Sequence, residues 1–489
     1  MKCLLVLGMA AVALPVAGPR LLCAQTAVPE QTVKGPDERM KADILLVVAH
    51  PDDEGGVTPY LARAIYDEHK RVAIVFATRG GSGGNDYSRE HGPALADIRE
   101  QEARQACAKL GITNVWFLEG KDTASQNVLN SLANWGHGAN LEALVRIVRL
   151  TRPEVIITWL PGIFLGENHG DHQAAGVLAT EAFDLAGDPT AFPAQVAGAS
   201  KRLEVYLENL TPWQPKKLYF FSDAEDQKQF VGTGPSYSIR EISPSQKKPY
   251  WRLAIDAATP HLTQFPEDIH RMTAMSDQQI TKFMEDPQHM WWTEPMTLIF
   301  GKAVFGGAES KSSDVFEGSN EHARVSERVE RKVPNAANLQ PGTTRQPDSS
   351  YSGPSGGRVA IGGVWKYYQG FSDAHALSPR STPAVPEIAV KSGSMISVPF
   401  CLMPPPRENR IITVSAEVPS GWKVVGGAGS FLVHSSYDSE LRLDVQTPEL
   451  RKEDLGKELR QIVVHVGSDG GPIGEIRLNV LLKASALPQ

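Results

Sequence analysis

Short apolar runs alternate with helical patterns over the first half of the chain, and this alternation constrains the fold more than any other feature. The strand-like runs lie at 44–49, 72–76, 115–118, 155–160 and 218–221. Helical patterns lie between them, for example at 95–110, before Gly111, and at 141–150, before Pro153, where helices commonly end. Strands and helices that alternate in this way form a mostly parallel sheet with helices on both faces. We therefore expect a Rossmann-like α/β fold here.

Metal-binding residue types follow two of these strands directly. The run AHPDDE (49–54) comes after the first strand, and the run NHGDH (168–172) comes after the fourth. Ligands of an open α/β sheet bind beyond the carboxyl ends of its strands. His and Asp are ordinary zinc ligands, and a catalytic zinc takes three protein ligands plus water. His50 and Asp53 could supply two ligands, which would leave Asp52 as a base, and His169 or His172 could supply the third.

Each of these clusters has a simpler interpretation when it is taken alone. Asp and Pro are common turn residues, Asp also caps helices, and two nearby histidines can simply lie on the surface. The two clusters occur at equivalent strand ends about a hundred residues apart. That placement favours one shared site over two unrelated turns.

The two motifs resemble those of the PIG-L/LmbE-like family of zinc-dependent N-acetylglucosaminyl deacetylases, over about residues 42–225. The resemblance implies one Zn²⁺ per chain, or another divalent metal, bound by His50, Asp53 and His172. It also implies that Asp52 is the general base. His169 would stabilise the oxyanion or donate a proton, and Asp171 would orient His169.

Three further residues match the family pattern less specifically. The resemblance implies that Arg99, on the helix after the second strand, and Asp122, after the third, bind substrate. Glu54 would lie behind the ligands and fix one of them or the backbone of the motif. The alternatives are that Arg99 only pairs with Glu102 on its own helix and that Asp122 only begins a turn.

The N-terminus has the pattern of an export signal over residues 1–24. Lys2 supplies the positive charge, residues 4–17 form a short apolar run, and cleavage is expected after Ala24. A lipid anchor on Cys23 is the minor alternative. The apolar run is too short to span a membrane comfortably, so we expect an exported protein, periplasmic or secreted, with no stable transmembrane segment in the mature chain.

The second half of the chain has a different pattern. Residues 335–358 are rich in Pro, Gly, Ser, Thr, Asn and Gln, which is typical of a linker. About seven short strands separated by turn residues follow residue 383, which predicts an immunoglobulin-like β-sandwich. We therefore predict a deacetylase domain at 40–310, a linker and irregular region at 311–382 and a sandwich at 383–486. A chain cut near Pro347 should keep a folded catalytic domain.

The predicted reaction is removal of an N-acetyl group from an N-acetylglucosamine-type glycoside or glycoconjugate, including polymeric ones. A net charge of −7 argues against a nucleic-acid partner. One alternative is a zinc amidase that cleaves another amide, such as a thiol conjugate, although those intermediates are cytoplasmic and the chain looks exported. The other is a non-catalytic glycan-binding protein on a deacetylase scaffold, which would have no reason to keep Asp52.

Overall fold

The computed structural model describes most of the chain between residues 37 and 483. The described residues are 37–164, 169–198, 207–224, 227–265, 267, 271–272, 274–285, 292–304, 314–317, 359–378, 385–403, 408–434, 440–451 and 458–483. The predicted export signal, the Cys23 anchor and most of the predicted linker lie outside them.

A six-stranded sheet forms the centre of the N-terminal domain, with strand order β3-β2-β1-β4-β5-β8. The first five strands run parallel, and only β8 is antiparallel to its neighbour β5. The strands are β1 (Ile44–Val48), β2 (Val72–Thr78), β3 (Asn114–Gly120), β4 (Val155–Trp159), β5 (Lys217–Phe221) and β8 (Ile299–Ala303). The predicted Rossmann-like α/β fold is confirmed. The strand order reverses between β1 and β4, which is where such sheets bind ligands.

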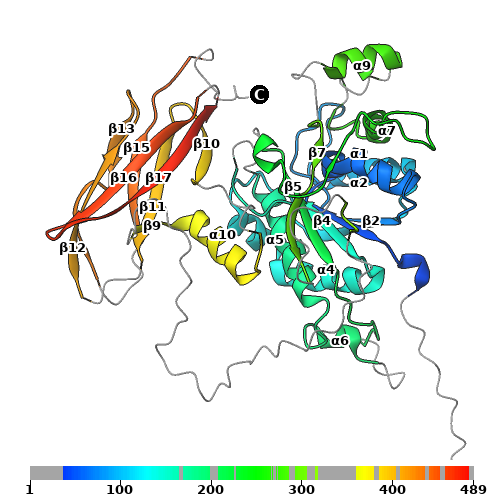
Figure 1. Cartoon of the computed structure of the whole chain (residues 1–489), viewed down its shortest axis with the longest axis horizontal. Helices are drawn as coiled ribbons and strands as arrows, with labels where there is room; N and C mark the ends of the chain where they lie inside the picture. The colour runs from blue at the N-terminus through cyan, green and yellow to red at the C-terminus, as the bar shows by residue number, and fades with distance from the viewer. Residues whose placement is uncertain are drawn as a thin grey trace, which may run out of the picture.

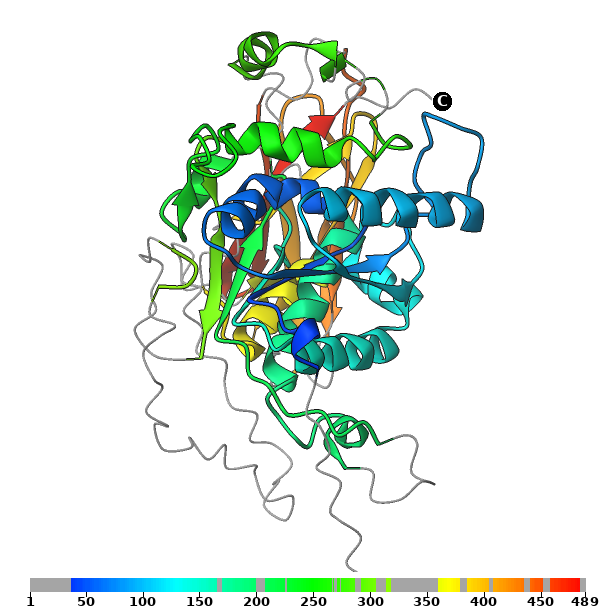
Figure 2. The same ribbon diagram turned by 90° about the vertical axis from the view of Figure 1, so that its right-hand side faces the viewer.

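Helices cover both faces of this sheet, as Figures 1 and 2 show. One face carries α1 (Thr58–Tyr66), α2 (Pro93–Lys109) and α7 (Tyr250–Ala258). The other carries α3 (Val128–Trp135), α4 (His137–Thr151) and α5 (Gly170–Leu185). Among the described residues, this half also contains the α-helices α6 (Pro193–Val196) and α9 (Asp277–Glu285). All five residues of β1 are buried, because helices cover both of its faces.

The C-terminal half is a sandwich of two sheets around its own apolar core. One sheet has the order β10-β17-β16-β12-β14 and the other β13-β15-β11-β9. Their strands are β9 (Val359–Ile361), β10 (Glu387–Lys391), β11 (Met395–Leu402), β12 (Arg410–Glu417), β13 (Lys423–Gly426), β14 (Gly429–Val433), β15 (Leu441–Gln446), β16 (Arg460–Ser468) and β17 (Gly471–Lys483). The predicted sandwich is confirmed, and β9 and β14 are strands that the sequence pattern did not indicate.

The region predicted as linker, 311–382, contains an ordered connection between the two halves, so that prediction needs correction. β9 pairs with β11 of the sandwich, whereas α10 (Gly363–Ala374) packs Tyr368 and Phe371 into the core of the N-terminal domain. The Tyr368 hydroxyl hydrogen-bonds Gln173 on α5. Asp184, also on α5, accepts from Nδ1 of His375 at 2.7 Å. The composition of 335–358 predicted an end to the catalytic domain, but apolar residues further along complete its core.

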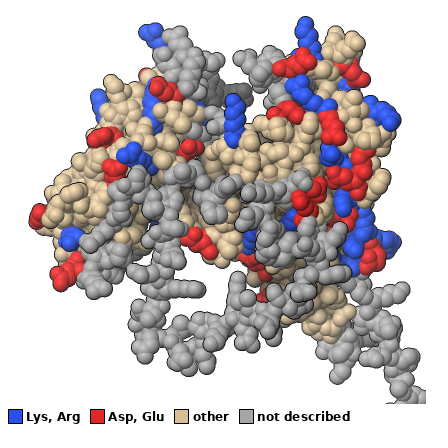
Figure 3. Space-filling model, in the orientation of Figure 1, with Lys and Arg blue, Asp and Glu red and all other residues tan. Residues whose placement is uncertain are grey.

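The described part of the face in Figure 3 carries charged side chains of both signs. Lys and Arg are interspersed with Asp and Glu over the described part of the face in Figure 3. Within the described ranges, every helix is too short or too polar to cross a bilayer.

Candidate active site

Asp53 lies in a tight turn at the carboxyl end of β1. Its Oδ2 accepts three hydrogen bonds, from the backbone N–H groups of Ala49 and His50, both at 2.9 Å, and from the indole N–H of Trp159 at 2.8 Å. Because these donors hold Oδ2, the other oxygen, Oδ1, faces His50 and His172. Burial alone would raise the pKa of Asp53, but His172 and His50 lower it well below its usual range. Asp53 is therefore an ionised carboxylate with one oxygen fixed and one free to bind a cation.

His172 lies in the first turn of α5, which begins just after the fourth strand. Its ring stacks on Trp159 with the ring centroids 4.0 Å apart and the planes 3° from parallel. Its Nε2 lies 3.3 Å from Oδ1 of Asp53. Trp159 thus positions both residues, holding the carboxylate through its N–H and the imidazole through its face.

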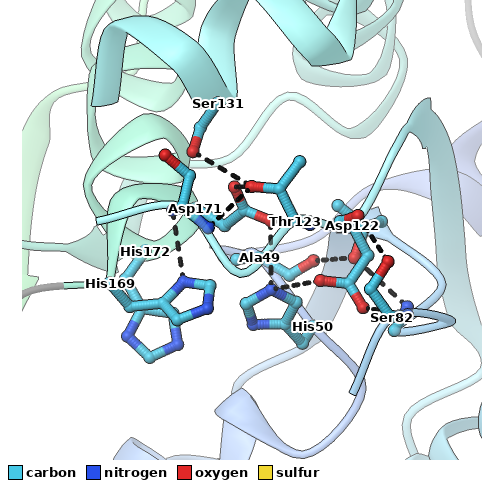
Figure 4. Close-up of polar contacts among 12 residues, drawn as sticks. Ala49, His50, Ser82, Asp122, Thr123, Ser131, His169, Asp171 and His172 are labelled. Atoms are coloured by element: carbon cyan, nitrogen blue, oxygen red, sulfur yellow. Dashed lines mark hydrogen bonds and ion pairs between the residues drawn. The ribbon is translucent and has the colours of Figure 1, made fainter. Parts of the chain in front are cut away.

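His50 is held from its other side by two carboxylates, as Figure 4 shows. Its Nε2 lies 3.2 Å from Oδ1 of Asp122 and 3.4 Å from Oδ2 of Asp171. These acceptors place the ring proton on Nε2, which leaves Nδ1 facing Oδ1 of Asp53 at 3.5 Å. Burial lowers the pKa of His50, but Asp53, Asp122 and Asp171 outweigh it and raise that pKa well above its usual value. The surroundings of His50 thus favour a positive charge.

The two separations between Oδ1 of Asp53 and the imidazoles are those expected around a divalent cation. In a tetrahedral site with bonds of about 2.1 Å, ligand atoms lie about 3.4 Å apart. Oδ1 of Asp53 is 3.5 Å from Nδ1 of His50 and 3.3 Å from Nε2 of His172. Among the described residues, ligand atoms also lie within 4.8 Å of one another in two sets, His50 with His169 and His172, and His50 with Asp122 and Asp171.

The hydrogen bonds distinguish the ligands from their supports. Asp122 accepts from the backbone N–H of Ser82 at 2.6 Å, and Asp171 accepts from the backbone N–H of Thr123 at 2.9 Å. Both carboxylates are thus engaged by the loop around them and by the proton of His50. Asp53 Oδ1, by contrast, faces only the two imidazoles. The structure therefore contains a possible His/Asp metal site formed by His50, Asp53 and His172.

Asp52 lies beside this site in an unusual backbone conformation, with φ 108° and ψ −24°. Its backbone N–H donates to Oε2 of Glu54 at 3.0 Å, so Glu54 fixes the backbone of the motif. Burial and the charge of Asp53 raise the pKa of Asp52 to about 7. A cation bound by Asp53 would oppose that shift. A carboxylate that takes up protons near neutral pH is well suited to act as a base.

His169 caps the N-terminus of α5 and completes a triangle of imidazoles. Its Nδ1 accepts the backbone N–H of Asp171 at 3.2 Å. Its ring centroid is 4.9 Å from those of both His50 and His172. Burial, together with the charges of His50 and His172, lowers the pKa of His169 to about 4. A neutral ring whose Nδ1 accepts must carry its proton on Nε2, so His169 can donate a hydrogen bond.

Asp171, Asp122 and Arg99 make contacts that the sequence analysis did not predict. Asp171 was expected to orient His169, but its carboxylate binds His50 and Thr123, and only its backbone N–H reaches His169. Asp122 was expected to bind substrate, which stays a prediction, and in the structure its carboxylate contacts His50. The loop after β3 explains both contacts, because it brings Asp122 against His50 and brings Thr123 against the carboxylate of Asp171 on α5.

Arg99 was also expected to bind substrate, and the structure engages it elsewhere. Its guanidinium donates to the carbonyls of Gly80 at 2.8 Å and Gly84 at 2.6 Å, and the residue is buried. It does not pair with Glu102, which instead accepts from Thr263. Arg99 therefore holds the glycine-rich loop after β2 against α2.

The structure adds residues that the sequence analysis missed. Trp159 lies inside the predicted strand 155–160, where an aromatic residue is ordinary, and only its position near the end of that strand pointed to the site. Thr123 and Ser82 are polar loop residues with no distinguishing pattern. His261 is buried and contacts Oε1 of Glu54 through Nε2 at 2.6 Å. It is 207 residues away along the chain, and no local pattern connects the two.

The fold and the site together define a doubly wound α/β protein with a possible His/Asp metal site at the switch point of its sheet. The family model described as PIG-L, GlcNAc-PI de-N-acetylase, matches residues 45–183. The 1D-myo-inositol 2-acetamido-2-deoxy-alpha-D-glucopyranoside deacetylase 1 of Frankia alni is 30% identical over 256 residues, which cover 49% of this chain and 77% of that protein. The chain therefore belongs to the PIG-L family of de-N-acetylases.

Two further similarities lie at lower identity. The 1D-myo-inositol 2-acetamido-2-deoxy-alpha-D-glucopyranoside deacetylase of Thermobifida fusca is 25% identical over 307 residues, which cover 56% of this chain and 98% of that protein. Among solved structures, the N,N'-diacetylchitobiose deacetylase from Pyrococcus horikoshii has 20% identity and a TM-score of 0.37, and the match covers 53% of this chain and 84% of that chain.

Proposed function

We propose that this protein is a zinc-dependent hydrolase that removes the N-acetyl group from an N-acetylglucosamine-type glycoside or glycoconjugate. The observation that carries the proposal is that Oδ1 of Asp53 lies within 3.5 Å of Nδ1 of His50 and 3.3 Å of Nε2 of His172, with the ring of His169 4.9 Å from that of His50. Its relatives in Frankia alni and Thermobifida fusca are named as deacetylases of a 2-acetamido-2-deoxy-glucopyranoside of inositol. Those names favour a sugar acetamide over a thiol conjugate.

The chain supplies the groups that amide hydrolysis needs. A divalent cation held by His50, Asp53 and His172 would act as a Lewis acid that acidifies water and polarises the amide carbonyl. Asp52 would accept a proton from the attacking water as its oxygen bonds to the carbonyl carbon. The N–H of His169 would stabilise the tetrahedral oxyanion. The C–N bond then breaks, and the proton returns to the leaving amine, giving acetate and the free amino sugar.

Around this centre, the roles of the supporting residues follow from their contacts. Asp122 and Asp171 would hold His50 in the tautomer that presents Nδ1 to the cation. Trp159 would keep Oδ1 of Asp53 pointing at it. An intact base in a fully assembled site argues against a non-catalytic glycan-binding protein on this scaffold.

The test is acetate release by purified protein, stripped of metal and reloaded with Zn²⁺, Co²⁺ or Mn²⁺ in turn. The substrates are free N-acetylglucosamine, its methyl glycoside, its inositol glycoside and N,N'-diacetylchitobiose. An N-acetylcysteine conjugate serves as the non-sugar control. We expect zinc-dependent acetate release from the glycosides. Activity confined to the conjugate, or activity that survives complete metal removal, would refute the proposal.

Export remains a proposal that rests on residues 1–24 alone. It would place the reaction outside the cytoplasm, where glycan polymers are available. The test is to follow the size and location of the protein in fractionated cells. Full-length, uncleaved protein in the cytosol would refute it.

A further inference from the structure

The segment that follows α7 packs against the back of the HPDDE turn. Thr263 donates to Glu102 on α2, through its backbone N–H at 3.0 Å and its hydroxyl at 2.6 Å. The side-chain amide of Gln264 donates to the carbonyl of Pro51. His261 is 2% exposed, and its Nε2 lies 2.6 Å from Oε1 of Glu54. The segment therefore contacts the turn at Pro51 and Glu54.

These contacts connect His261 to Asp52 through two hydrogen bonds in series. One oxygen of Glu54 binds the imidazole of His261, and the other accepts the backbone N–H of Asp52 at 3.0 Å. Asp52 adopts φ 108°, a region that residues other than glycine rarely occupy and that persists only where surrounding contacts impose it. The Glu54 carboxylate is therefore one of the contacts that hold Asp52, and His261 fixes the Glu54 carboxylate in turn.

His261 also has a feature that simple packing does not explain. Among the described residues, its Nδ1 is buried without a hydrogen-bond partner. An apolar side chain of similar volume would avoid the destabilising effect of an unsatisfied buried polar atom. The bond from Nε2 to Glu54 is what the histidine provides at this position and an apolar residue would not.

We propose that His261 is a positioning residue for the general base, acting through Glu54 to hold the backbone of Asp52 in its left-handed conformation. The proposal rests on the proposed function, in which Asp52 takes the proton from water. His261 itself touches neither the metal ligands nor the reacting atoms. Its loss should therefore weaken the chemical step and leave metal binding and substrate binding intact.

The experiment compares His261→Leu, which removes the donor and keeps the volume, with His261→Gln, which can still donate to Glu54. We expect His261→Leu to lower kcat about 10- to 100-fold, as outer-shell changes typically do, with KM and bound metal per chain unchanged. His261→Gln should recover most of kcat. Thr263→Val is the matched control, because it removes a hydrogen bond of the same segment that does not lead to the turn, and its kcat should stay within about twofold.

Two further measurements keep the proposal testable if activity is weak. His261→Leu and Glu54→Gln should be non-additive in kcat, because both act on the same bond to Asp52. A crystal structure of His261→Leu should show Asp52 released from φ near 108°. An unchanged kcat, or an unmoved Asp52 backbone, would overturn the role of His261. Absence of acetate release by the wild type would overturn the proposed function instead, and the conformation of Asp52 would still decide the role of His261.

Discussion

Asp52→Asn should make the metal-free protein more stable while it abolishes most of the activity. Burial and Asp53 raise the pKa of Asp52 from its usual 3.8 to about 7. A carboxyl group with a raised pKa in the folded state costs nothing below about pH 4, where it is protonated in both states, and destabilises the fold increasingly as the pH rises towards 7. Each pKa unit corresponds to about 1.4 kcal/mol, so the ionised carboxylate costs about 4 kcal/mol at pH 7. Asparagine removes that cost.

Asparagine is the right replacement because it keeps the shape and tolerates a positive φ better than most residues. The free energy of unfolding, measured by urea denaturation in EDTA, should rise by up to about 4 kcal/mol at pH 7 to 8 and stay unchanged at pH 4. Asp86→Asn, at an exposed position, is the control. In the metal-loaded enzyme the same change should lower kcat about 10²- to 10⁴-fold with stoichiometric metal retained.

Three results would refute this reasoning. Equal stability of variant and wild type across the pH range would show that the site does not penalise the charge of Asp52. Loss of bound metal in the variant would make Asp52 a ligand, and unchanged kcat would end its role as the base.

Three other expectations follow from the described contacts. Trp159→Phe removes the indole N–H from Asp53 but keeps the stack, and should lower metal affinity about 10- to 100-fold in chelator competition; unchanged affinity would show that the indole bond does not orient the carboxylate. Burial raises the pKa of Asp184, but its partners His375 and Lys302 lower that pKa overall. The stability that the ionised carboxylate provides is therefore present above its usual pKa and is lost as the pH falls through the lowered value. In Asp184→Asn, the free energy of unfolding should fall less steeply with pH over this acid range. A chain ending after Ser378 should fold and bind metal. A chain ending near Pro347 should be less stable and less soluble because it lacks α10. Equal stability of the two chains would contradict the packing of α10.

The parallel sheet was predictable because each of its first five strands carries its own signal. Runs such as 44–48 are continuously apolar, and parallel strands covered on both faces require that. The candidate metal ligands His50 and Asp53 follow the end of β1 within a few residues, and His172 lies in the helix that follows β4. The parallel topology places these two segments at the same edge of the sheet, so the sequence could indicate that the three side chains lie near one another. β8 escaped prediction because it is a short edge strand with half-buried residues, which leave little periodicity.

The partners of the site residues could not be read from the sequence. Whether Asp171 contacts His169, two residues away, or His50, 121 residues away, depends on the path of the loop after β3. His261 depends in the same way on how the segment after α7 folds back. A hydrophobic pattern shows which face of an element is buried, but it does not show which polar groups meet across a tertiary contact.

The path of the chain through β9, α10 and β10 limits how the two halves could be exchanged between proteins. The chain enters the sandwich at β9, leaves it to complete the catalytic core with α10, and returns to the sandwich at β10. A recombination event that copied only the residues after 383 would transfer a sandwich without β9, so one sheet of the transferred copy would lack a strand. We therefore expect the two halves to be inherited together, with the breakpoint of any transfer outside residues 359–391.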